Sequence, residues 1–287
     1  ISIEDLEMIL HPMAEDAKEA VGSMGDDTPL AVLSDRYRPL YHFFRQNFSQ
    51  VTNPPIDSLR ENKVMSLKTR FGNLGNILDF DNLTEENIYV LDSPILTNSQ
   101  LKKFKRFFSK KTKEIDCTFD ISSSIKDRIA EIREEAETSV REGSTCLILS
   151  DKNISNKKAS IPSILTVGAV HSHLVRQQLR TFASVNVATG ECLDVHHFAV
   201  LIGVGATTVN PYGAEWAIEE RKEKGLIETL ALFDAVNNYK TAIETGLLKI
   251  MSKMGISVLS SYRGGYNFEA LGLSRSLVVD YFPSMSS

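Results

Sequence analysis

Thr145-Cys146-Leu147-Ile148-Leu149-Ser150 is a short apolar run of the length and composition typical of a strand. A long charged helix is predicted before it, from Ser122 to Glu142, and Gly143 is placed to end that helix. A second helix is predicted after it, from Pro162 to Leu179. Strands that alternate with helices indicate parallel pairing through helical crossovers, and hence an α/β sheet or barrel.

The same alternation continues on both sides of this stretch. Further strands are predicted at residues 88–92, 115–119, 182–188, 207–210 and 256–260, and further helices at residues 98–109 and 225–254. The run 196–205 is β-branched enough for a strand, but we expect a helix because the strands on either side need a crossover. This makes about six strands, against about eight in a regular closed barrel. We therefore expect residues 88–287 to form an incomplete or degenerate (β/α) barrel-like domain.

Residues 1–87 are expected to form an N-terminal segment of helices and loops. Ser2 can cap a helix through about Leu10, and Pro12 can open another helix through about Ala20. From Pro39 onward, apolar residues recur at helical spacing and predict a helix with a buried aromatic face. These residues are Leu40, Phe43, Phe44, Phe48 and Val51.

A stiff corner is predicted at Val51-Thr52-Asn53-Pro54-Pro55-Ile56-Asp57, because each proline fixes its own φ and donates no backbone hydrogen bond. Asn53 should be extended and free to cap a short helix that starts at Pro54. Such a corner is either a plain turn between helices or a place that presents backbone atoms at a gate or docking edge.

A glycine-rich loop precedes this corner, between Gly22 and Leu30. Its Asp26 and Asp27 could bind a divalent metal, but hard cations need more oxygen ligands than this loop alone supplies. We therefore favour capping and turn roles for the two aspartates, and predict no metal site.

The composition is that of an ordinary globular domain and excludes several classes of protein. The formal net charge of −5 over 287 residues argues against a nucleic-acid binder. No secretory signal and no apolar run long enough to span a membrane is found. The thiols of Cys117, Cys146 and Cys192 are too scattered for a zinc or iron–sulfur motif, and suit a reducing cytoplasm. The first residue, Ile1, suggests a piece of a longer protein.

One loop and the histidines are the remaining places where chemistry could reside. The loop Arg263-Gly264-Gly265 follows a predicted strand and could hold a phosphate on backbone amides with help from the arginine, or be only a tight turn. The histidine pairs His171 with His173, and His196 with His197, have no spacing typical of a catalytic triad. The residues alone therefore predict a cytosolic α/β domain without a self-evident active site.

Several longer runs closely resemble, in the same order, the central domain of the glutamate synthase large chain, and together they extend over nearly the whole sequence. They are Gly22-Ser23-Met24-Gly25-Asp26-Asp27-Thr28-Pro29-Leu30-Ala31, Arg38-Pro39-Leu40-Tyr41, Val51-Thr52-Asn53-Pro54-Pro55-Ile56-Asp57, Asp92-Ser93-Pro94-Ile95-Leu96, His196-His197-Phe198-Ala199-Val200-Leu201-Ile202-Gly203, Val209-Asn210-Pro211-Tyr212 and Lys249-Ile250-Met251-Ser252-Lys253-Met254-Gly255-Ile256.

This resemblance implies a domain that connects a glutaminase domain to an FMN-dependent synthase barrel in one parent chain. The parent enzyme converts L-glutamine, 2-oxoglutarate and reductant to L-glutamate, with FMN and an iron–sulfur cluster held in other domains. The central domain is similar to a degenerate version of the synthase barrel, without FMN, catalytic residues or metal of its own. The family's N-terminal cysteine nucleophile and its closely spaced cluster cysteines have no counterpart in this sequence, which begins at Ile1.

The resemblance also implies a role for particular residues of the N-terminal segment. Residues 1–87 would contact the neighbouring domains, and Met24, Gly25, Thr52 and Asn53 would line the constricted opening of a tunnel that carries ammonia between the active sites. Ammonia must stay neutral to act as a nucleophile, and a narrow, poorly hydrated passage disfavours its charged form.

A second reading from another class stays open at this point. It is a free-standing β/α barrel enzyme that binds a phosphorylated ligand or a flavin at Arg263-Gly264-Gly265. Tight retention of added FMN would favour that reading. The parent's electron donor, whether NADPH, NADH or ferredoxin, is not determined by this part of the sequence.

Overall fold

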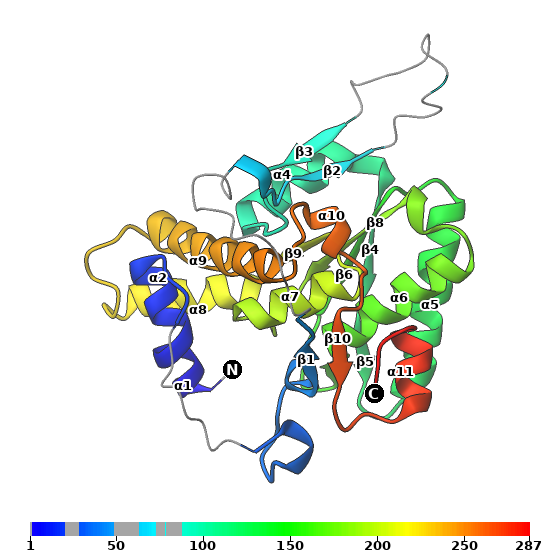
Figure 1. Cartoon of the computed structure of the whole chain (residues 1–287), viewed down its shortest axis with the longest axis horizontal. Helices are drawn as coiled ribbons and strands as arrows, with labels where there is room; N and C mark the ends of the chain where they lie inside the picture. Colours follow the sequence, from blue (N-terminus) through cyan, green and yellow to red (C-terminus); the bar gives the residue numbers. More distant parts are fainter. Residues whose placement is uncertain (1, 21–28, 49–62, 73–77, 79–87) are drawn as a thin grey trace.

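The structure is a computed structural model of the chain and describes residues 2–20, 29–48, 63–72, 78 and 88–287. Its centre is a four-stranded parallel sheet in the order β4-β6-β8-β9 (Figure 1). The strands are β4 (Thr112–Asp116), β6 (Cys146–Ser150), β8 (Ser184–Ala188) and β9 (Thr208–Asn210). One row of buried residues runs in register across all of them, namely Ile115, Leu149, Val187 and Val209.

Both faces of this sheet are covered by other elements. Successive side chains of a strand point to opposite sides, so each strand contributes to two cores. Leu147 and Leu149 pack into the larger core with α5 (Ile125–Arg141) and α6 (Ser163–Arg176). Cys146 and Ile148 pack into a second core formed with α4 (Asn98–Phe108). The predicted strand at residues 145–150 is therefore confirmed as β6, which is buried on both faces.

Helices link the strands as parallel pairing requires. The helix α5 joins β4 to β6, α6 joins β6 to β8, and α7 (Val195–Gly203) joins β8 to β9. Asp194 caps α7 by accepting a hydrogen bond from the backbone N–H of His197 at 2.9 Å, and Gly205 follows with a φ of +124°. The prediction of a helix across residues 196–205 is confirmed.

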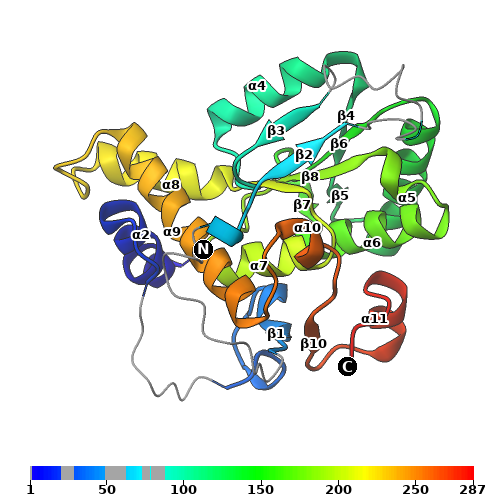
Figure 2. The ribbon, with the colours of Figure 1, turned by 45° about the horizontal axis from the view of Figure 1, so that its top comes forward.

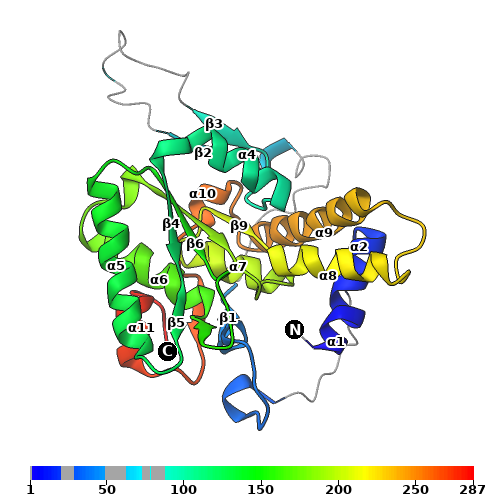
Figure 3. The same ribbon diagram turned by 180° about the vertical axis from the view of Figure 1, so that it is seen from behind.

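The remaining elements surround this sheet. The antiparallel pair of strands β2 (Thr69–Phe71) and β3 (Tyr89–Leu91) lies beside α4 (Figure 2). The paired helices α8 (Tyr212–Glu223) and α9 (Leu232–Lys253) extend away from the sheet with α2 (His11–Asp16) against α9 (Figure 3). Smaller elements are α1 (Ile3–Asp5), a π-helical turn (Leu6–Leu10), 3-10 turns (Ala31–Leu33, Leu40–Phe43, Ser109–Lys111, Arg180–Phe182), β1 (Phe44–Gln46), β5 (Thr118–Asp120), β7 (Lys158–Ser160), α10 (Leu259–Tyr262), β10 (Phe268–Ala270) and α11 (Arg275–Tyr281).

The expected incomplete barrel is confirmed, since the parallel sheet of the described residues has four strands rather than a closed ring. Three of the six predicted strands differ. Residues 88–92 contribute β3, which pairs antiparallel with β2 outside the main sheet. Residues 115–119 divide at Cys117 between β4 and β5. Residues 256–260 contribute a single parallel bridge, from Val258 to Ser66, and then enter α10.

The predicted helix from Pro39 is wrong over its described part. The chain makes a short 3-10 turn at Leu40–Phe43 and then β1, which pairs antiparallel with β10. Phe44 is buried because it lies opposite Ala270 and packs edge-on against Phe282 at 5.1 Å between ring centroids. Pairing with a strand more than two hundred residues away therefore overrides the local helical spacing.

Two further helical predictions need adjustment. Ser2 caps α1 in a capping box with Asp5, as expected, but the helical path continues through Pro12 rather than restarting there. The helix predicted from Gly225 begins at Leu232, and the α8 helix before it was not predicted. None of the helices among the described residues is long and apolar enough to cross a bilayer.

Glu215 on α8 gives the fold a pH-dependent contact with α4. Its Oε1 accepts a hydrogen bond from the backbone N–H of Asn98 at 2.7 Å, and burial raises the pKa of this carboxyl from 4.5 to about 7. Between these two pH values the folded state binds more protons than the unfolded state, so stability falls as pH rises through the window.

We expect Glu215→Gln to remove this fall while keeping the oxygen that accepts from Asn98. The variant should match the wild type below pH 4.5 and exceed its free energy of unfolding above pH 7, by at most about 3 kcal/mol. Urea unfolding across the pH range measures the difference. Glu223→Gln, an exposed change on the same helix, is the control. Wild-type and Glu215→Gln curves that stay parallel over the window would contradict the assignment.

Candidate functional site

The carboxyl ends of the parallel strands are where barrel folds carry their catalytic residues, so this edge is the first place to look for a site. A cavity of about 680 Å³ opens here. One wall is formed by residues that follow the strands, Asp151 after β6 and Glu191 after β8. The opposite wall is formed by the N-terminal segment, chiefly residues 36–42.

Asp151 is the anchor of this edge. Its side chain is buried and accepts hydrogen bonds from the Thr189 hydroxyl at 2.7 Å, the Gly190 backbone N–H at 3.2 Å and the Tyr212 hydroxyl at 2.5 Å. Burial and the bond to Asp151 raise the pKa of Tyr212, so its hydroxyl stays protonated and continues to donate. The carboxylate is therefore occupied by donors of the protein itself.

Glu191 lies in a second chain of contacts at the same edge. Its Oε2 accepts from both the backbone N–H and the hydroxyl of Ser163, each at 2.9 Å. The Tyr41 hydroxyl lies 2.5 Å from the Ser163 oxygen, to which it can donate. Burial raises the pKa of Glu191 and raises that of Tyr41 well above its usual range. This contact ties the N-terminal segment to the start of α6.

His197 completes the wall of the cavity. Its ring stacks on Tyr41 with 4.4 Å between centroids, and its Nδ1 accepts from the backbone N–H of Leu193 at 3.2 Å. Burial lowers the pKa of this histidine to about 4, so it is neutral at neutral pH and carries its proton on Nε2. The Nε2 atom has no hydrogen-bond partner among the described residues, because the Asp194 carboxylate lies 3.7 Å away.

The side chains at this edge mainly hold one another in position. The two carboxyls are bonded to donors of the protein, and the tyrosines and the histidine are held in their neutral forms. Among the described residues, no group of three or more His, Cys, Asp or Glu side chains could hold a metal ion. The hydrogen bonds of Asp151 and Glu191 therefore hold the walls of this cavity in place.

The predicted tunnel residues Met24, Gly25, Thr52 and Asn53 lie outside the residues that the structure describes. So does the predicted proline corner, and so does the short helix after it.

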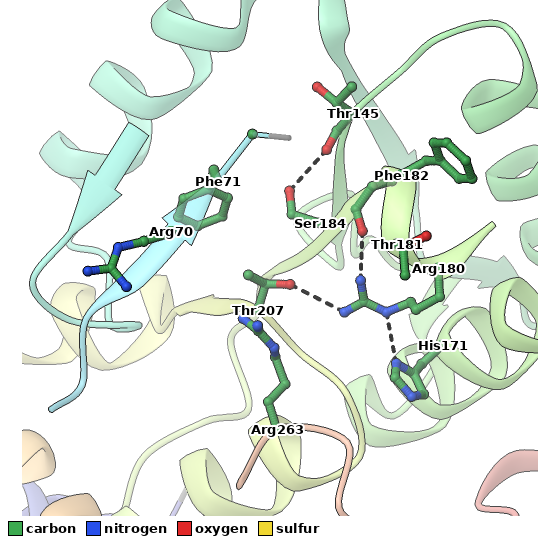
Figure 4. A pocket seen from close by; sticks show the side chains of 12 residues that line it. Arg70, Phe71, Thr145, His171, Arg180, Thr181, Phe182, Ser184, Thr207 and Arg263 are labelled. Carbon is green, nitrogen blue, oxygen red and sulfur yellow. Dashed lines mark hydrogen bonds between the residues drawn. The ribbon is translucent and has the colours of Figure 1, made fainter. Parts of the chain in front are cut away.

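The predicted phosphate loop is described and does not form a cradle. The Gly264 N–H donates to the Ile202 carbonyl and the Gly265 N–H donates to the Tyr262 carbonyl, each at 3.1 Å. Arg263 lines a cavity with Thr145 and Thr207, which precede β6 and β9, at the amino ends of the strands (Figure 4). A flavin phosphate held as in barrel enzymes needs free amides at the opposite edge. These loop residues therefore do not fit FMN.

No pattern in the sequence groups Asp151, Glu191, His197 and Tyr41 as one site. The available signal was position, since Asp151 and Glu191 come within three residues of the ends of two predicted strands. The ends of parallel strands meet at one edge, so polar residues there are candidates even without a recognisable spacing.

Comparison with known proteins identifies the family. The family model described as "Glutamate synthase central domain" matches residues 1–274. The chain is 59% identical to the glutamate synthase [NADPH] large chain of Azospirillum brasilense, over 100% of this chain and 19% of that protein. It is 40% identical to the glutamate synthase [NADH] of Saccharomyces cerevisiae, over 100% of this chain and 14% of that one.

A further relative is a ferredoxin-dependent, chloroplastic or mitochondrial glutamate synthase of Arabidopsis thaliana, 41% identical over 96% of this chain and 18% of the relative. Among solved structures, a mutant flavocytochrome b2 with pyruvate bound aligns with a TM-score of 0.50 at 10% identity, over 90% of this chain and 86% of that one. That likeness supports the barrel-related fold alone. The chain spans 19% or less of these glutamate synthases, and it belongs to the glutamate synthase central domain family.

Proposed function

We propose that this chain is a non-catalytic central domain that connects the glutaminase domain to the FMN synthase domain of a glutamate synthase and lines part of the ammonia tunnel. The observation that carries the proposal is the carboxyl-end edge of the sheet, where Asp151 and Glu191 accept hydrogen bonds from donors of the protein itself. The small share of the relatives' length that the chain spans supports a place beside other domains.

On this proposal, the reaction and its cofactors belong to the parent enzyme. FMN and an iron–sulfur cluster would be held elsewhere, and the domain itself would be inactive. The cysteines support the placement of the iron–sulfur cluster in another domain. Burial raises the pKa of Cys117 to about 12 and that of Cys146 to about 11. Cluster ligands are thiolates, and these thiols are held in their protonated form.

The electron donor and the compartment concern the parent as well. The relatives bear names with NADPH, NADH and ferredoxin, so the domain is compatible with each kind of donor. Three free, buried cysteines support a reducing compartment, and we propose the cytoplasm.

The division of labour within the chain is part of the proposal. Residues 88–287 would serve as the rigid body, and residues 1–87 would contact the neighbouring domains and shape the tunnel. The N-terminal segment is well placed for this role. The Tyr41 hydroxyl contacts Ser163 at the carboxyl-end edge of the sheet, and β1 pairs with β10. The constricted opening would be formed by Met24, Gly25, Thr52 and Asn53.

The tunnel role is tested in the intact parent enzyme by Thr52→Val and Asn53→Ala. We expect glutamine hydrolysis to run ahead of glutamate formation, because ammonia that leaves a disturbed passage is lost to solvent. Synthesis from added ammonia should survive, since the synthase site is untouched. The measurement is the ratio of glutamine consumed to reductant oxidised.

Thr229→Val, an exposed change in the loop before α9, is the matched control and should keep the wild-type ratio. If the tunnel variants also keep the wild-type ratio, these residues have no conduit role. If both activities fall together with the melting temperature, the proline corner is only a structural turn.

A further inference from the structure

A second cavity, of about 460 Å³, opens at the amino ends of the strands, the edge opposite to Asp151. Thr145, Ser184 and Thr207 stand at the starts of β6, β8 and β9 and line it (Figure 4). Three arginines line it, namely Arg70 on β2, Arg180 before β8 and Arg263 after α10, and the last two lie beside Thr207 (Figure 4).

Arg180 is held rigidly by neutral acceptors. Its Nε donates to Nδ1 of His171 at 2.9 Å, and its two terminal nitrogens donate to the carbonyls of Ala183 at 2.6 Å and Gly205 at 2.9 Å. Burial and the two arginines Arg180 and Arg263 lower the pKa of His171 to about 3, so this histidine adds no charge, and its Nδ1 accepts from Arg180 while its proton is on Nε2. The positive charge of Arg180 is thus fixed in place and not balanced by these contacts.

Arg263 has no such partners. Its own backbone is fixed, because its N–H donates to the Leu259 carbonyl at 2.9 Å and the next residue, Gly264, is anchored to Ile202. Its partly buried guanidinium has no hydrogen-bond or ion-pair partner among the described residues. Figure 4 shows the side chain directed toward Thr207 and Arg180.

The charged residues that line this cavity are positive. No aspartate or glutamate is among the described residues that line it. Burial and the nearby Arg263 lower the pKa of Arg180 to about 10, which reflects the cost of bringing two cations together out of water. The Thr207 oxygen accepts from the Val185 N–H at 3.1 Å and from Arg180 at 3.4 Å, and its hydroxyl proton has no acceptor among the described residues. Guanidinium and hydroxyl donors therefore meet in this cavity, and a guanidinium fork matches a carboxylate or a phosphate.

We propose that this cavity binds a small oxyanion, a carboxylate or phosphate group, between Arg180 and Arg263, with the Thr207 hydroxyl as a further donor. Phe71 and Phe182 line the same cavity, and their rings offer apolar surface to a further part of the ligand. The proposal stands apart from the tunnel, because it concerns the opposite edge of the sheet and no residue of the constricted opening.

The test is calorimetric titration of the 287-residue chain with inorganic phosphate, succinate and chloride at constant ionic strength. We expect saturable, one-site binding of phosphate, succinate or both, and none of chloride. Binding of phosphate alone identifies a phosphorylated ligand, and binding of succinate alone identifies a carboxylate ligand. Arg263→Gln should weaken the affinity about tenfold or more, because it removes a charge-assisted contact.

Arg106→Gln is the matched control, since it removes the same charge from an exposed position on α4 and should leave the affinity unchanged. Arg263→Lys keeps the charge without the planar fork, and this variant should bind the oxyanion more weakly than the wild type does. It serves as the test variant if circular dichroism shows that Arg263→Gln does not fold. The proposal is overturned if neither oxyanion binds saturably, if Arg263→Lys binds like the wild type, or if Arg106→Gln weakens binding as much as Arg263→Gln.

Discussion

Replacing Gly205 by alanine is expected to cost about 4 kcal/mol of folding free energy, because it combines a strained backbone with a steric clash. The residue has a φ of +124°, and an added Cβ would lie 2.3 Å from Cγ and Nδ1 of the His171 ring. That ring cannot simply move away, since its Nδ1 accepts from Arg180, which is itself held by two carbonyls. Urea unfolding of the variant and the wild type measures the loss.

Gly143→Ala separates the two causes. Gly143 has a φ of +100°, close to that of Gly205, but nothing lies within 4 Å of the position of its Cβ. This control should show the backbone cost alone, about 1–2 kcal/mol. If both variants lose the same amount, the contact with His171 contributes nothing and our account of the Arg180 environment is wrong.

The parallel sheet could be predicted from the sequence because its strands and helices are each recognisable from their own residues. The strand Cys146–Ser150 is apolar throughout, and the helices α5 and α6 beside it have clear boundaries, with Ser124 capping α5 and Gly143 following it. The ambiguous helix α7 was settled by topology rather than composition, since two parallel strands in sequence need a crossover.

The elements that were predicted wrongly depend on distant partners. The segment of β1 has the spacing of a helix, yet Phe44 pairs with Ala270 in β10. The strand β3 satisfies its backbone through β2 and stays outside the main sheet. Neither pairing can be recognised within its own short segment, because β1 pairs with residues more than two hundred positions away and β3 pairs with residues 18 to 22 positions away.

The candidate site shows the same limit more strongly. The Tyr41 hydroxyl meets Ser163 across 122 positions of the chain, and Asp151 meets Tyr212 across 61. No spacing rule connects such residues. What the sequence could offer was the edge on which they meet, because Asp151 and Glu191 follow strands that were predicted correctly.

Asp151→Ala is expected to destabilise the domain by about 4 kcal/mol, because it leaves several buried donors without an acceptor. Asp151 is 2% exposed and accepts from Thr189, Gly190 and Tyr212. The Thr189 oxygen in turn accepts from the N–H of Glu191, so the loss should extend along the loop that follows β8. The free energy of unfolding from urea titration measures the effect.

Asp120→Ala and Asp151→Asn are the controls that show whether burial of the donors causes the loss of stability in Asp151→Ala. Asp120 also collects two donors, the N–H and hydroxyl of Ser122, but its carboxylate is fully exposed, so water can replace it and stability should stay close to the wild type. Asp151→Asn keeps one acceptor oxygen but turns an amide group toward the remaining donors, so its loss should lie between those of the two alanine variants. A loss in Asp151→Ala no larger than that in Asp120→Ala would mean that water satisfies the exposed donors, and that this network does not hold the edge together.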